Sequence, residues 1–117
     1  MLCLALCAPP HAAQSRFDWA NYDRNRPTVL SGVVWTAENL DGVVVIRIKT
    51  DPRGGFASTI WVVALGTPKE LTAAGLMLEL PLGVPVTATV WEHKVPGNKE
   101  ARAQQVSFNR GEPITLR

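Results

Sequence analysis

Hydrophobic residues recur along the chain in five short runs, each with the length of a β-strand. The runs are rich in Val, Ile and Trp and are bounded by Gly, Pro, Asp and Asn, which is typical of strands joined by turns. We expect strands at Thr28–Trp35, Val43–Lys49, Ile60–Leu65, Val86–Trp91 and Ala101–Phe108, with an edge piece at Pro113–Leu116.

Two of these strands show signs of irregular pairing. Gly32 lies inside the first strand, and a glycine there usually marks a bulge or a sharp bend. In the strand at Ala101–Phe108 the alternation slips between Ala103 and Val106, which predicts another bulge. A polar loop from Thr36 to Gly42 is expected between the first two strands, ending in a turn at its last two residues.

A helix start follows the third apolar run at once. The run stops at Gly66, and the Thr67 hydroxyl can accept from the backbone N–H of Glu70 while the Glu70 carboxylate reaches back, which makes a capping box. Pro68 stands at the first helical position, where its missing N–H costs nothing. Gly75 is a natural left-handed stop, so the sequence predicts one short helix.

Three strands, a helix and two strands, in that order, predict a five-stranded OB-fold-like Greek-key barrel. An open α+β sheet is the alternative. With 117 residues, 46% of them hydrophobic, the chain has room for one core. We expect residues 28–117 to form a single barrel domain and residues 14–27 an irregular segment leading into it. In that segment Phe17, Trp19 and Tyr22 are expected on the surface or as a plug for one end.

Residues 1–13, MLCLALCAPPHAA, predict a secretory signal peptide with cleavage after Ala13. A positively charged lead-in is missing, so translation can start upstream of Met1; a disordered tail is the alternative. No later stretch is long enough to span a bilayer, and we expect a periplasmic or secreted protein. Both cysteines, Cys3 and Cys7, lie in the leader, so the mature chain has no cysteine for a disulfide, a thiolate nucleophile or a metal ligand. A lipoprotein attached through Cys7 is an alternative, although Leu6 stands where a small residue is normally required.

From Tyr22 onward the chain resembles a family of small exported bacterial proteins classified as a domain of unknown function. The family pattern combines a leader, L-x-G-x-V, W-x-(I/V)-E-x-G-(S/T)-P, a glycine near the helix end, a basic-Gly hairpin and a closing A-x-x-V. The matching residues are Leu30–Val34, Trp61, Gly66-Thr67-Pro68, Gly75, Gly83, Lys94–Asn98 and Ala103–Val106. The resemblance implies an OB-like barrel and export, and it implies no activity.

This sequence departs from the family at its histidines. Members carry a His-His pair near the mature start and an Asn-Pro-His after the first strand. Here those regions read Gln14-Ser15-Arg16-Phe17 and Ala37-Glu38-Asn39-Leu40, and the glutamate of the third strand is Ala64. If the family histidines bind a metal or haem, this chain has lost that site.

Candidate catalytic and metal-binding residues are few. The mature chain has one histidine, His93, and no cysteine, whereas a transition-metal site takes three or four ligands. There is no G-x-S-x-G motif and no phosphate-binding glycine loop. We therefore expect no cofactor, no metal and no enzymatic activity. The alternatives are an envelope hydrolase that uses His93 with a carboxylate, or a vestigial relative of a metal-binding family.

The remaining hypothesis is a binding surface on the barrel. OB-folds bind ligands on the face of strands two and three and on nearby loops. Here that face is expected to carry Arg47, Lys49 and Trp61, with Trp91 and Lys94 close by. Aromatic rings beside cations can stack on a ligand and neutralise it. The alternative is a tryptophan in the core beside ordinary surface cations.

Export makes a protein partner or a small envelope ligand the expected occupant of this surface. Nucleic acid is disfavoured by export and by the net charge of only +2. The sequence by itself names neither the ligand nor the oligomeric state.

Overall fold

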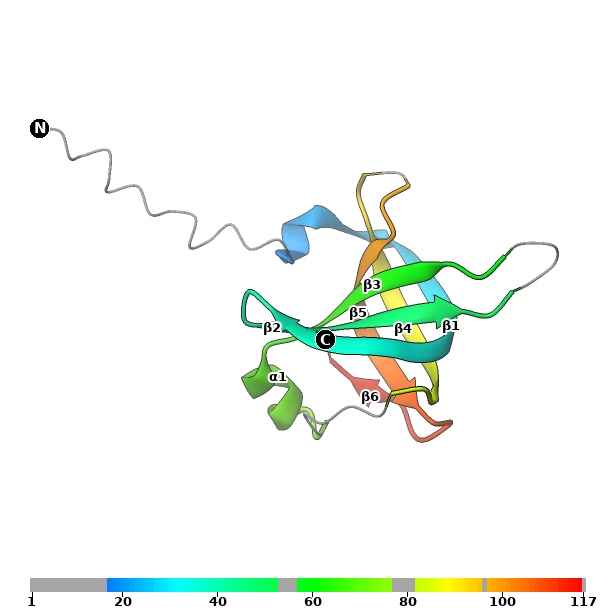
Figure 1. Ribbon diagram of the computed structural model, residues 1–117. Coiled ribbons are helices and arrows are strands. Elements are labelled where there is room, and N and C mark those ends of the chain that lie inside the picture. Colours follow the sequence, from blue (N-terminus) through cyan, green and yellow to red (C-terminus); the bar gives the residue numbers. More distant parts are fainter. Residues whose placement is uncertain (1–16, 53–56, 77–81, 96, 117) are drawn as a thin grey trace, which may run out of the picture.

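Figure 1 shows a computed structural model, which describes residues 17–52, 57–76, 82–95 and 97–116. The predicted leader lies outside these ranges. The elements in chain order are β1 (Tyr22–Leu40), β2 (Val43–Thr50), β3 (Ile60–Gly66), α1 (Pro68–Ala73), β4 (Pro85–His93), β5 (Glu100–Phe108) and β6 (Ile114–Thr115). A short 3-10 turn, Trp19–Asn21, precedes β1. Among the described residues, no helix is long and apolar enough to cross a membrane.

The strands form one sheet that closes on itself as a barrel (Figure 1). Antiparallel neighbours follow the order β3-β2-β1-β4-β5-β6. A parallel pairing of Val62–Ala64 in β3 with Glu100–Arg102 in β5 then joins the two sides of this row. This is the five-stranded OB-like ring, with α1 between β3 and β4 and β6 as a short addition on β5. The fold prediction is confirmed, and the open sheet is excluded by the β3–β5 pairing.

Strand β1 is much longer than its predicted range of Thr28–Trp35. Its first part, from Tyr22, pairs with β4, and its last part, to Leu40, pairs with β2. The predicted irregular segment and the predicted loop are therefore wrong at Tyr22–Pro27 and at Thr36–Leu40. Both ends are rich in polar side chains, so periodicity gave no signal there. Thr36–Leu40 pairs with β2 throughout. At the other end Tyr22 and Pro27 pair with β4, and the register shifts between them.

The hairpin between β1 and β2 is correspondingly tight. Asp41 and Gly42 both have positive φ, 52° and 80°, as a two-residue hairpin turn requires. The Asn39 side chain accepts from the Gly42 N–H at 3.0 Å and closes the turn. This part of the sequence prediction is confirmed.

The bend in β1 lies at Trp35 and not at Gly32. Val34 pairs with Ile48 and Thr36 with Arg47, so Trp35 is the extra residue of a bulge. Gly32 has a different function, because a Cβ there would lie 2.0 Å from the Lys49 carbonyl oxygen. The glycine therefore allows β2 to pass close to β1 at this point.

The predicted bulge in β5 is present at Gln104. Gln105 pairs with Thr89 and Ala103 with Val90, which leaves Gln104 without an opposite residue. The bulge explains why Ala103 and Val106 are both buried although they are three positions apart.

The barrel interior is a single apolar core. Its buried members are Leu30, Val34, Ile46, Ile48, Trp61, Val63, Leu65, Leu71, Leu76, Val86, Ala88, Val90, Ala101, Ala103 and Val106. Leu71 anchors α1 against this core. The predicted capping box is confirmed, since Thr67 Oγ1 accepts from the Glu70 N–H at 3.2 Å and Glu70 Oε1 accepts from the Thr67 N–H at 2.8 Å.

A second apolar cluster lies on the outer face of the barrel. Its members are Phe17, Tyr22, Val43, Val45 and Ala64. The segment Phe17–Asn21, called the N-terminal arm below, lies against the barrel here (Figure 1). Phe17 and Tyr22 are thus buried on a side of the barrel, whereas Trp19 is half-buried.

Candidate functional site

The structure separates the five predicted binding residues into three places. Arg47 and Lys49 lie on the outward face of β2, Trp61 points into the barrel, and Trp91 and Lys94 lie at the end of β4. A common exposed face for all five residues does not exist.

The placement of Trp61 on the exposed face is wrong. Its side chain is 9% exposed and belongs to the interior core, opposite Ile48 of β2. Strand β3 is apolar on both faces, so alternation along the sequence cannot tell inside from outside. The register with β2 decides the direction, and Lys99 Nζ lies 5.1 Å from the ring centroid.

The two β2 cations are in different situations. Arg47 is held by β1, because its Nη1 donates to Glu38 Oε1 at 2.7 Å and to Glu38 Oε2 at 3.2 Å. Thr36 lies 3.4 Å from the same nitrogen. The Arg47 charge is therefore compensated within the sheet. Lys49 is exposed further along the strand.

Trp91 takes part in a cluster that the sequence did not predict. Its ring meets that of Trp19 edge to face, with centroids 4.8 Å apart and an interplanar angle of 69°. The Arg24 guanidinium lies 5.0 Å from the Trp91 ring and 5.9 Å from the Trp19 ring. The Arg102 guanidinium lies 3.9 Å from the Trp19 ring. Edge-to-face pairs contribute about 0.5–1.5 kcal/mol, and exposed cation–π contacts about 0.5–1 kcal/mol each.

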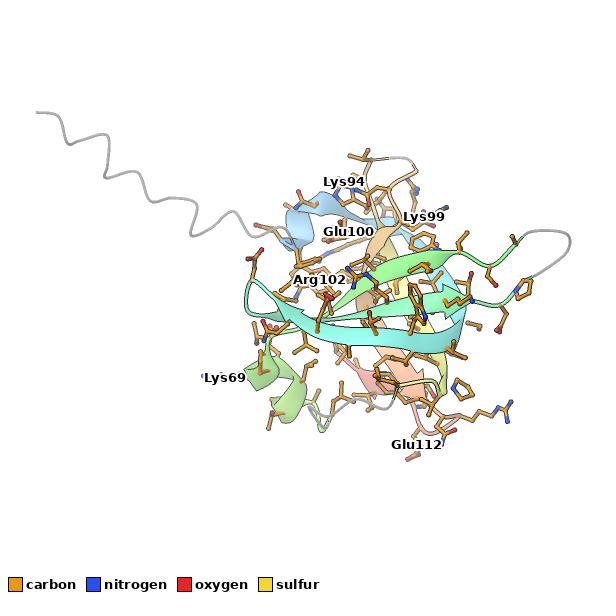
Figure 2. All side chains as sticks on the ribbon, in the orientation of Figure 1. Lys69, Lys94, Lys99, Glu100, Arg102 and Glu112 are labelled. Carbon is orange, nitrogen blue, oxygen red and sulfur yellow. The ribbon has the colours of Figure 1, made fainter. Side chains whose placement is uncertain are left out.

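Hydrogen bonds within the arm, to the β4–β5 hairpin and to β5 hold Trp19 in this place. Asp18 Oδ1 accepts from the Ala20 N–H at 2.9 Å and caps the 3-10 turn. The Asn21 carbonyl then accepts from the Lys94 N–H at 2.9 Å, which ties the arm to the β4–β5 hairpin. Arg102, 8% exposed, donates through Nη1 to the Phe17 carbonyl. In Figure 2, Arg102 and Lys94 lie on the side of the arm, away from Lys69 and Glu112.

An open hollow of ≈ 320 Å³ adjoins this cluster. Its lining residues are Trp19, Ala20, Tyr22, Asp23, Arg24, Asn25 and Lys94. We call it the arm hollow. Asp23 Oδ1 is engaged by the Asn25 N–H at 2.9 Å. The hollow thus combines two aromatic residues, Trp19 and Tyr22, with two cations and one carboxylate.

Arg24 and Lys94 differ from neighbouring cations in their pairing. Arg26 pairs with Glu92 at 3.1 Å, and Arg47 pairs with Glu38. In the described ranges neither Arg24 nor Lys94 forms an ion pair. These two charges are therefore available to a ligand in the arm hollow.

His93 lies beneath this region, at the end of β4. Its ring meets that of Tyr22 edge to face at 5.4 Å, and its Nδ1 accepts from the Val95 N–H at 3.1 Å. An accepting Nδ1 leaves the proton of the neutral ring on Nε2. Across residues 17–52, 57–76, 82–95 and 97–116, no three His, Cys, Asp or Glu side chains gather where they could hold a metal ion.

Sequence reasoning named Trp91 and Lys94 as candidate binding residues, and it did not name Trp19, Arg24 or Arg102, which lie in the same cluster. The available signal was the mixture of aromatic and charged residues in FDWANYDRNR, residues 17–26. This mixture has no period, so the sequence predicts an irregular segment there. Nothing in the sequence indicates a role for Arg102, because a polar residue within a predicted strand is common.

Comparisons of the chain with protein-family models, with curated proteins and with solved structures gave no match. The family resemblance noted from the sequence motifs therefore stays a prediction. Conclusions about function rest on the geometry of the arm hollow and on the sequence.

Proposed function

We propose that this protein is an exported, non-enzymatic binding module that holds a small envelope ligand, or an exposed group of a protein partner, in the arm hollow. The observation that carries the proposal is that Arg24 and Lys94 line the same hollow as Trp19 and that, within the described part of the chain, neither charge has a carboxylate partner. An exposed cation held against an aromatic ring without a counter-charge is a ready site for an incoming group.

The shape of the site supports this proposal. Small-molecule sites are concave, combine aromatic side chains with a few polar groups, and start at about 300 Å³. The arm hollow has ≈ 320 Å³, a tryptophan, an asparagine and two cations. It lies on the rim of the barrel, where the start of β1 meets the β4–β5 hairpin.

The N-terminal arm explains why the ligand site is displaced from the usual OB-fold position. OB-folds commonly bind on the outer face of strands two and three. Here Phe17 packs on Val43, Val45 and Ala64 of that face and is fully buried. The arm therefore occupies part of the usual surface and builds a new one at its edge.

Export is the second part of the proposal, and it rests on the leader pattern of residues 1–13. Cleavage of the leader would remove both cysteines, so the mature chain would form no disulfide in an oxidising compartment.

The non-enzymatic part is supported by the arrangement around His93. With Nδ1 accepting from the Val95 N–H, the neutral ring has no free lone pair to act as a general base. The adjacent Glu92 is engaged by Arg26 and Thr28. His93→Ala should therefore leave ligand binding unchanged, whereas a hydrolase that depends on His93 would lose its turnover.

A thermal-shift screen of the chain without residues 1–13 tests the proposal. The panel holds divalent metals, haem, acidic and neutral glycans, single-stranded DNA and envelope metabolites. A ligand at about a hundred times its dissociation constant adds roughly 2.7 kcal/mol, which raises the midpoint by on the order of ten degrees. The shift should disappear in Trp19→Leu and Arg24→Gln. A ligand whose shift is the same in both variants would overturn the assignment of the site.

A further inference from the structure

We propose that the arm hollow binds an acidic sugar unit, with the sugar ring against Trp19 and its carboxylate held by Arg24 and Lys94. This inference rests on the proposed function and specifies the ligand class of the same site.

The charge of the hollow selects an anion. Two cations line it, while its one carboxylate, Asp23, already accepts from the Asn25 N–H. A neutral ligand would leave Arg24 and Lys94 uncompensated as it displaced their water. A ligand carboxylate would replace that water with charge-assisted hydrogen bonds, which are about twice as strong as neutral ones.

The geometry of Arg24 selects a planar, two-oxygen anion. Its guanidinium is positioned by the Trp91 and Trp19 rings and not by a carboxylate. Its N–H donors therefore remain for a ligand, and a guanidinium presents them as a fork that fits a carboxylate in a bidentate manner. Stacking also lowers the conformational freedom that Arg24 would otherwise lose on binding.

The other lining groups select a sugar. One face of a sugar ring carries C–H groups, and these pack on the electron-rich face of an aromatic ring such as Trp19. Sugar hydroxyls need both donors and acceptors, which the Asn25 amide and the second oxygen of Asp23 can supply. An acidic peptide can pair with Arg24 and Lys94, but it makes fewer contacts than a sugar with the Trp19 ring and the polar lining groups.

The size and openness of the hollow fit one unit of a longer chain. A volume of ≈ 320 Å³ is at the lower limit for small-molecule sites. Because the hollow opens at the barrel surface, neighbouring units of an oligosaccharide can extend into solvent. Two free cations are also too few for a polyphosphate or nucleic acid, whose binding grows with the number of neutralised charges.

Calorimetric titration of the full chain tests this inference with three defined probes of equal length. The probes are a tetragalacturonate, the neutral tetragalactose and a tetraglutamate peptide. We expect binding of the tetragalacturonate, at least about ten-fold weaker binding of the other two, and lower affinity at higher salt. Arg24→Gln and Lys94→Gln should each reduce the uronate affinity by about ten-fold or more.

Two matched controls accompany these variants. Arg26→Gln removes an arginine from the same strand that is already paired with Glu92, and Lys69→Gln removes a lysine on α1 (Figure 2). Both should leave the uronate affinity within about two-fold, because neither side chain lines the hollow. Arg24→Lys keeps the charge but loses the fork, so an affinity between those of the parent and Arg24→Gln is expected.

Each other outcome overturns a defined part of the inference. Tetraglutamate binding as tight as that of tetragalacturonate would replace the sugar by an acidic peptide. Equal binding of tetragalactose would show that the carboxylate does not contribute to recognition. If none of the three probes binds but another ligand of the thermal-shift panel depends on Trp19 and Arg24, the sugar inference fails and the proposed function stands. Uronate binding that Arg24→Gln and Arg26→Gln weaken equally would refute the arm hollow as the binding site, and with it the proposed function.

Discussion

Two surface hollows of similar size, each with a tryptophan and a lysine, differ in what holds the aromatic ring. The arm hollow has ≈ 320 Å³ and contains Trp19 with Lys94. The second hollow has ≈ 300 Å³ and contains Trp61 with Lys99, where β3 begins. Trp61 is continuous with the barrel core, whereas Trp19 is held by the arm and by two arginines. A tryptophan beside a lysine is therefore not by itself a binding site, because Trp61 supports the fold whereas Trp19 lines the hollow that we propose as the ligand site.

The pairing of charges separates the two hollows further. The second hollow contains Asp51 and Lys99, one charge of each sign. The arm hollow has a surplus of one positive charge and two cations without a carboxylate partner among the described residues. The surplus is the property that we associate with binding. Substitution of Trp61 should therefore lower mainly the stability of the fold, whereas substitution of Arg24 should lower mainly ligand affinity.

The largest effect on stability is expected for Trp61→Ala. Removing a buried aromatic side chain from a core costs about 3–5 kcal/mol through lost burial and the cavity left behind. Urea unfolding followed by far-UV circular dichroism measures this loss. Trp35→Ala is the control, since Trp35 is 51% exposed and should lose less than about 1 kcal/mol. Equal effects of the two variants would contradict the inward position of Trp61.

Phe17→Ala should have the next largest effect and should act on the arm hollow. The fully buried ring anchors the arm on Val43 and Val45, and its loss is expected to cost about 3 kcal/mol, the lower end of the range for aromatic truncation. Since the arm carries Trp19, ligand binding should weaken as well. Hydrogen exchange at the Lys94 amide, which donates to Asn21, should become faster. Unchanged exchange there would show that the arm does not depend on Phe17.

The ion pair of Arg47 with Glu38 should contribute little. Both side chains are 33% exposed, and pairs in such positions are worth about 0.2–1 kcal/mol. A double-mutant cycle with Arg47→Gln and Glu38→Gln measures the coupling directly. Ligand affinity should stay unchanged in all three variants, because neither residue lines the arm hollow. A loss of ligand affinity in Arg47→Gln would show that Arg47 belongs to the binding site.

Arg24→Gln is also expected to have a small effect on stability, at most about 1 kcal/mol, because Arg24 is exposed and contributes through ring contacts alone. The same variant should nevertheless abolish most ligand binding. Thermal unfolding and ligand titration on one sample measure both quantities. A destabilisation as large as that of Phe17→Ala would identify Arg24 as a structural residue.

Local rules allowed much of the fold to be predicted from the sequence. The capping box at Thr67 and Glu70, the turn at Asp41-Gly42 and the bulge near Gln104 each depend on residues a few positions apart. The order of strands and helix then restricted the topology to an OB-like barrel. Hydrogen bonds between near neighbours and the alternation of side chains along a strand are properties of short segments, so the amino-acid sequence determined them.

The candidate site could be predicted only in part, because its residues come from distant segments. Trp91 and Lys94 were identified from one hairpin, but their partners Trp19 and Arg24 come from the start of the chain. Strand β3 is apolar on both faces, so its pairing with β2 and β5 decided that Trp61 points inward. The tertiary structure alone determined these features, since closing the barrel sets which side chains meet across it, and no local pattern records contacts between residues that are far apart in the chain.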